Sequence, residues 1–340
     1  VFPMAETKPV ARWPATALAG LALAFGLIGR IPSLHSHWLL AQAADALEEK
    51  NDDDFRKLAE RAARADPADT AALNALGFHF GEEAFQAKSP AERVRPAQDA
   101  VRFFGASLQR NPDQEIAETN LAWVLLPDDP AASESHFLRA AAILPEKEGL
   151  GVGLARAELA QGKRDAAISA LVAEVLMNPP YLFSPDWRES PFQEIHGPVL
   201  AAVTARATEL ARDPRLRPWQ QSAVTFVGAV AQWRAGREKA VDVANVALSP
   251  EQRRFFASGE AQALADSLAR PGGDGLLMRA RRPGYGVLMR NLDAPMPADF
   301  YWSRHDRKVV EAGMALIPGR LHLPGRILLA QLEGRPSASP

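Results

Sequence analysis

The chain has no cysteine among its 340 residues, and only 7% of its residues are aromatic. The lack of cysteine excludes disulfides, thiolate metal sites, iron–sulfur clusters and a cysteine nucleophile. Its 39 Lys and Arg nearly balance 41 Asp and Glu, so no overall attraction to nucleic acid is expected. Phosphate-binding glycine loops, HExxH and GxSxG motifs are also missing, and the seven histidines are scattered. We therefore predict no catalytic residues, no metal site and no cofactor, in a protein whose plentiful alanine favours helices.

One uncharged run stands near the N-terminus. The first 17 residues of the range 13–30 carry no charge, and as a helix they would span about 25 Å, near the lower limit for a bilayer. We predict a tail at 1–12 and one transmembrane helix at 13–30. Lys8 and Arg12 before it place the N-terminus in the cytoplasm and the body on the outer or periplasmic side of a bacterial cell membrane. A secretory signal peptide is the alternative. The residues expected to pack this helix on other membrane helices are the small ones: Ala17, Gly20 and Ala24.

A short proline-containing phrase recurs at four predicted helix ends. The prolines are Pro67, Pro112, Pro145 and Pro179, at spacings of 45, 33 and 34 residues. The last two spacings match the repeat length of about 34 residues found in tetratricopeptide proteins. The first spacing is longer, which predicts an insertion near residues 81–95 that extends the first helix of its repeat and the following turn.

The residues within these segments support the same repeat. Leu76-Gly77, Leu121-Ala122 and Leu154-Ala155 stand where the first helix of a tetratricopeptide repeat keeps its Leu-Gly/Ala pair. Residues 38–180 therefore resemble the tetratricopeptide-repeat family, although the family's aromatic residue at the start of the first helix is missing throughout. The resemblance implies an all-α solenoid of stacked helix pairs, and an irregular helical bundle is the alternative. The first helices are expected at about 72–80, 115–126 and 151–160.

Stacked helical repeats form extended concave surfaces that bind partners. We expect a partner-binding groove lined by the first helices. Its candidate residues are Asn74, His79, Asn120 and Trp123. Because leucines on the same helices are needed for packing, some of these four residues are expected to lie in the core.

The repeat pattern weakens after residue 180. We predict divergent helical repeats in the range 181–270. This range begins with a loop at 180–198 that is rich in proline and aromatic residues. Residues 271–340 predict a small basic module, in which two β-prone runs form a two-stranded ribbon. Its basic patch comprises Arg279, Arg281, Arg282, Arg304, Arg307 and Lys308. We expect this patch to bind an anionic glycan, a lipid head group or an acidic partner, and a solvated surface is the alternative.

Two further segments bear on function. Residues 178–190 and 283–297 resemble parts of the tetratricopeptide regions associated with bacterial O-antigen ligase and polymerase-like proteins. This resemblance implies a single-pass accessory protein of an envelope polysaccharide polymerase or ligase. We therefore expect a non-catalytic, membrane-anchored scaffold that binds protein partners, integral membrane proteins first among them, and no nucleic acid. The alternatives are a structural subunit of a photosynthetic, respiratory or transport complex, and an enzyme acting on glycans or lipids.

Overall fold

The computed structural model describes residues 31–49, 51–188, 190–236, 250, 253–254 and 321–334. Every regular element within these ranges is helical, with no strand among them, which confirms the all-α class for this part of the chain. No helix in these ranges combines the length and the apolar character that a bilayer crossing requires. The transmembrane helix predicted at 13–30 and the predicted ribbon lie outside the described residues.

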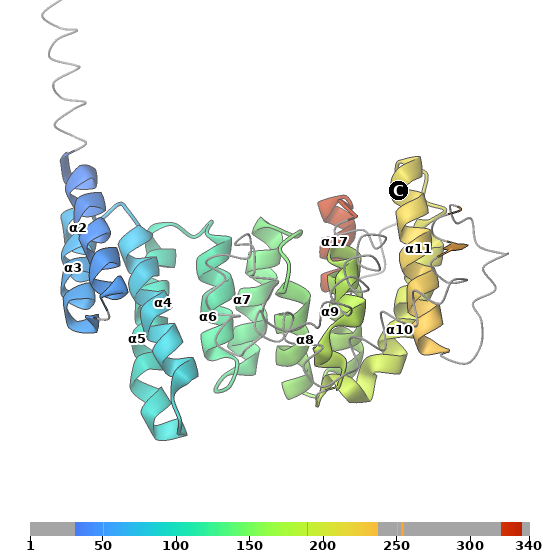
Figure 1. Cartoon of the computed structure of the whole chain (residues 1–340), viewed down its shortest axis with the longest axis horizontal. Coiled ribbons are helices and arrows are strands. Elements are labelled where there is room, and N and C mark those ends of the chain that lie inside the picture. The colour runs from blue at the N-terminus through green and yellow to red at the C-terminus, as the bar shows by residue number, and fades with distance from the viewer. Residues whose placement is uncertain are drawn as a thin grey trace, which may run out of the picture. The chain divides into compact units, whose positions relative to one another are not determined.

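The chain divides into two compact units, residues 1–76 and 77–340. The boundary falls inside helix α4 (Ala71–Gln86). In the first unit, α2 (Ile31–Glu48) and α3 (Asp52–Ala65) pack together as a helical hairpin (Figure 1). Their buried residues are mostly alanines together with Leu39 and Phe55, so the two backbones can approach closely.

In the second unit, α5 to α11 follow one another in a row, and each packs on the next (Figure 1). These helices are α5 (Pro90–Arg110), α6 (Glu115–Leu125), α7 (Pro130–Ile143), α8 (Leu150–Ala160), α9 (Arg164–Met177), α10 (Phe192–Leu210) and α11 (Pro218–Ala235). Two 3-10 turns, η1 (Pro179–Phe183) and η2 (Pro185–Arg188), lie between α9 and α10. A C-terminal helix, α17 (Gly325–Leu332), packs on α9 and α7.

Two successive helix pairs of this row have the same dimensions. Helices α6 and α7 contain 11 and 14 residues, and α8 and α9 again contain 11 and 14. The pair formed by α4 and α5 is longer, with 16 and 21 residues. The extra residues predicted near 81–95 therefore lengthen both helices of that pair, and not only the first helix and its turn.

Local signals set where the second helices of two pairs begin. The side chains of Ser89 and Asp129 accept hydrogen bonds from the backbone N–H groups of Glu92 and Ala132. A proline follows each cap at the first helical position, where its missing N–H costs no intrahelical hydrogen bond. These caps start α5 and α7.

The prediction of a loop at 180–198 is only partly correct. Helix α10 already begins at Phe192 and continues through Pro198. Phe192, Ile195 and Val199 form a buried stripe with helical spacing, and this burial outweighs the local disruption that an internal proline causes.

Candidate functional site

Small residues of the first helices allow close contacts with the second helices. A Cβ atom added at Gly77 of α4 would lie 2.8 Å from the ring of Phe104 in α5. In the next pair, the Ser133 hydroxyl of α7 donates a 2.8 Å hydrogen bond to the carbonyl oxygen of Ala122 in α6. Gly77 and Ala122 are the small members of two Leu-Gly/Ala pairs in the sequence, whereas α8 approaches α9 closely at Gly151, where an added Cβ would lie 2.4 Å from the carbonyl oxygen of Ala170.

Successive pairs are joined through Phe137 of α7, which is 1% exposed. Its ring fills the space left by Gly153 of α8, where an added Cβ would meet the Cζ atom of Phe137 at 2.2 Å. On another side, the indole of Trp123 in α6 meets the same ring edge to face, with centroids 5.4 Å apart. One phenylalanine thus connects α6, α7 and α8.

The four candidate groove residues have different environments. Asn120 and His79 are buried, whereas Asn74 and Trp123 are half-buried. The Asn120 amide donates a 2.6 Å hydrogen bond to the carbonyl oxygen of Ile116 in its own helix. His79 lies 3.4 Å from the Glu83 carboxylate, also within one helix. Part of the set therefore belongs to the interior.

Helix α6 carries three polar side-chain atoms that are closed off from solvent and make no hydrogen bond. They are Thr119 Oγ1, Asn120 Oδ1 and Trp123 Nε1. A buried polar atom without a partner costs about 1–3 kcal/mol, and such atoms are uncommon in native proteins. The half-buried Trp123 follows Thr119 by one helical turn, so the two side chains share one side of α6.

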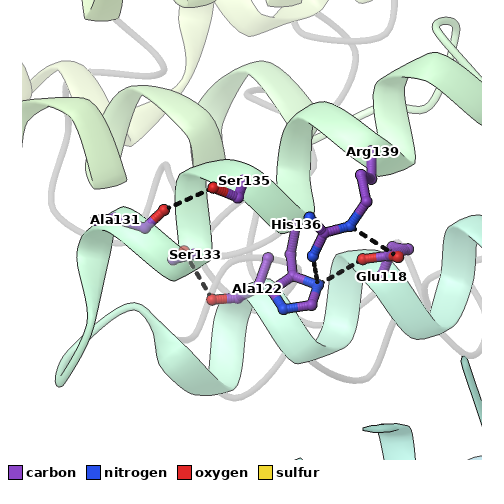
Figure 2. A network of polar contacts seen from close by, with 7 residues as sticks. All are labelled: Glu118, Ala122, Ala131, Ser133, Ser135, His136 and Arg139. Atoms are coloured by element: carbon purple, nitrogen blue, oxygen red, sulfur yellow. Dashed lines mark hydrogen bonds and ion pairs between the residues drawn. The ribbon is translucent and has the colours of Figure 1, made fainter. Parts of the chain in front are cut away.

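A buried carboxylate links α6 to α7 (Figure 2). Glu118, 4% exposed, lies 3.0 Å from Arg139 Nε through one oxygen and 2.5 Å from His136 Nδ1 through the other. The Arg139 Nη2 atom also lies 2.6 Å from His136 Nδ1. Glu118 stands on α6 and its two partners stand on α7, so this network joins the two helices of the pair.

The hydrogen bonds of His136 depend on whether its Nδ1 atom carries a proton. A guanidinium nitrogen can only donate, so His136 Nδ1 must accept when it bonds to Arg139. When Nδ1 carries a proton it donates to Glu118 instead. The two hydrogen bonds of this nitrogen are therefore alternatives, and of the two only the one to Glu118 joins α7 to α6.

Another buried carboxylate lies near α7 and the turn that joins α8 to α9. Glu158 of α8 is 4% exposed, and its Oε2 atom makes no hydrogen bond. The neighbouring carboxylate of Glu134 accepts hydrogen bonds of 2.6 Å from both Gln161 and Lys163. Burial and the charge of Glu134 raise the pKa of Glu158 to about 8, and Lys163 offsets part of that rise.

No set of three metal-ligating side chains converges within the parts of the chain that the structure describes. The predicted basic patch and the anchor-packing residues Ala17, Gly20 and Ala24 fall outside those parts. Among the predicted sites, the helix pairs and their surfaces are therefore the ones that lie within the described residues. No protein-family model matches the chain, and no curated protein matches its sequence.

Sequence reasoning did not single out Glu118 or Glu158 as a buried carboxylate. Glutamate within a helix is usually solvent-exposed, and His136 follows Glu118 by 18 residues, so no spacing rule joins them. One signal was present for Glu158, because it stands on a helix whose other residues are almost all small or apolar. Such a helix is expected to be buried on most of its sides, so a carboxylate on it is expected to be buried too.

Proposed function

We propose that the chain is a non-catalytic scaffold of the tetratricopeptide type, which binds partner proteins and is held at a membrane by residues 13–30. The observation that carries the repeat part is the equal length of two successive helix pairs, with second helices starting at Arg164 and Pro130, 34 residues apart. Each pair packs on the next. Stacked units of this kind present a continuous surface along one set of helices.

The surface proposed to bind a partner is formed by first helices of the second unit. We name it the first-helix face, and it consists of the half-buried side chains Ile116 and Trp123 of α6 and Arg156 and Leu159 of α8. Two apolar residues, one tryptophan and one arginine match the composition typical of interface centres.

The proposal predicts that a charge on this face prevents partner binding. Replacing Ile116→Arg should remove co-purifying proteins from the full chain isolated in mild detergent, because a cation must then be buried at the centre of the interface. Mass spectrometry of the co-purified proteins is the measurement. The matched control is Val94→Arg, since Val94 is 53% exposed on α5.

Equal recovery of partners with both variants would contradict the proposed face. Loss of partners with both would indicate that the binding surface lies elsewhere or that folding has failed, which circular dichroism decides. By the resemblance at 178–190 and 283–297, an envelope polysaccharide polymerase or ligase is the first partner to look for.

The membrane part of the proposal is supported by helix α2 in the first unit. Ile31, Leu34 and Trp38 are 58%, 68% and 54% exposed, and their spacing places them on one side of the helix. They directly follow the range 13–30, whose first 17 residues carry no charge. Exposed apolar residues next to a membrane segment, with tryptophan among them, suit the interface between lipid and water.

A cysteine-free chain makes this placement simple to test. The full chain carrying Leu34→Cys, labelled with an environment-sensitive dye and reconstituted into phospholipid vesicles, should show blue-shifted emission that spin-labelled lipids quench. The control is Lys57→Cys on α3, whose side chain is 72% exposed. If the dye showed the same emission shift and quenching at residues 34 and 57, or no quenching at residue 34, α2 would lie away from the lipid.

A further inference from the structure

The segment 321–334 lies on helices that precede it by more than eighty residues. Its helix α17 packs on α9 and α7 and lies beside α9 in Figure 1. Five large apolar side chains of this short segment are 2% exposed or less. They are Leu321, Leu323, Ile327, Leu328 and Leu332. The segment therefore buries one continuous apolar side, while polar Arg326 and Glu333 remain exposed.

The spacing of the buried side chains follows the shape of the segment. Leu321 and Leu323 are buried on either side of the exposed His322, whose backbone φ of 47° is left-handed, before helix α17 begins at Gly325. The Cβ position of Gly325 lies 3.3 Å from Pro145, in the loop after α7. A side chain at 325 would require Pro145 or the helix to shift by a few tenths of an ångström.

Side chains of the preceding helices also hydrogen-bond the backbone of the segment. Gln220 Nε2 of α11 donates to the carbonyl oxygen of His322 at 2.6 Å. The Ser169 hydroxyl of α9 donates to the carbonyl oxygen of Gln331 at 2.9 Å, and the Gln331 amide donates back to that hydroxyl. Backbone hydrogen bonds combined with apolar pockets are how proteins recognise peptides.

We propose that α7, α9 and the start of α11 form a peptide-binding site whose ligand is the chain's own segment 321–332. The ligand class is the sequence Leu-x-Leu-Pro followed by a helix with the pattern Ile-Leu-x-x-x-Leu. The chain between Gly236 and Leu321 tethers this ligand to its site, and a tether raises the effective concentration of a ligand. A modest intrinsic affinity is then enough to keep the segment bound. The segment can therefore dissociate and be replaced by another peptide of the same sequence. This inference does not rest on the first-helix face, because other helices carry it.

The test uses the full chain with a protease recognition sequence inserted after Gly319. After cleavage, the released segment should stay with the body on gel filtration and then be replaced by a dye-labelled synthetic peptide of residues 319–334. Fluorescence anisotropy follows the exchange. Three results would overturn the proposal: a segment that never exchanges over a day with excess peptide, one that leaves without the peptide rebinding, or unfolding of the body on cleavage.

Matched variants give the expected specificity. The peptide with Leu328→Ala should bind about 30-fold more weakly or worse, because a buried leucine side chain is lost. The peptide with Arg326→Ala should bind as the original does, since Arg326 is exposed. In the body, Ser169→Ala should weaken binding several-fold. The control Ser135→Ala should not, because the exposed Ser135 bonds to Ala131 within its own helix. Equal binding by the two variant peptides would contradict a specific site.

Discussion

Replacing Gly153 with alanine is expected to destabilise the second unit by about 1–3 kcal/mol, the usual cost of overpacking a core. The added Cβ would lie 2.2 Å from the Cζ atom of Phe137, a distance that real Cβ atoms do not adopt. Phe137 is 1% exposed and is also held by Trp123, so its ring has little room to move. Urea unfolding of the full chain, followed by circular dichroism, measures the loss.

The matched control is Gly105→Ala in α5. Gly105 also lies inside a helix, but nothing approaches its Cβ position within 4 Å. This substitution should stabilise the protein by up to about 1 kcal/mol, because alanine favours the helix over glycine. A similar gain in stability at Gly153 would mean that α7 and α8 do not pack as described.

Two contacts between a glycine and a phenylalanine show how far the sequence pattern predicts the packing of the helices. Gly77 meets Phe104 within one helix pair, and Gly153 meets Phe137 between two pairs. The first of these contacts could be predicted, since Gly77 belongs to a Leu-Gly pair and Phe104 stands before a repeat proline. Gly153 precedes the pair Leu154-Ala155, and nothing local indicates that it faces the previous repeat.

Helix positions were the most predictable part of the fold. The first helices were expected at about 115–126 and 151–160, and α6 and α8 occupy Glu115–Leu125 and Leu150–Ala160. Their ends depend on caps, turns and apolar spacing, which are local in the sequence. The start of α10 was missed because tertiary burial of Phe192 overrides the local effect of Pro198.

The polar sites and the docking of α17 could not be predicted in the same way. Ser169 meets Gln331 across 162 positions of the chain, and no periodicity reports such a contact. The candidate residue Asn120 illustrates a related problem. A polar residue on an apolar helix suggests either a binding surface or a buried site, and its 0% exposure places it in the interior.

Glu158 has the largest pH effect expected among the described residues. Burial, followed by the charge of Glu134, raises its pKa from 4.5 to about 8, while Lys163 acts in the opposite direction. The fold therefore accommodates the protonated acid better than the carboxylate. Its contribution to the free energy of unfolding is fully present below the unfolded pKa of 4.5 and is lost as pH rises through about 8.

The variant Glu158→Gln should remove this loss, because the amide has nearly the shape of the protonated acid and never ionises. Its stability advantage over the original chain should grow with pH by at most about 1.4 kcal/mol per unit. That growth gives up to about 3 kcal/mol at neutral pH and levels off above the folded pKa. Urea unfolding at several values between about pH 5 and pH 9 measures the difference.

The control for this series is Glu146→Gln, since Glu146 is an exposed glutamate in the loop after α7. Its difference from the original chain should stay close to zero at every pH, because an exposed carboxylate loses little solvation on folding. A Glu158→Gln advantage that is constant across the pH range would show that packing, and not ionisation, causes it. A variant less stable than the original chain at alkaline pH would show that the Glu158 carboxylate is stabilised where it lies, contrary to its orphaned Oε2 atom.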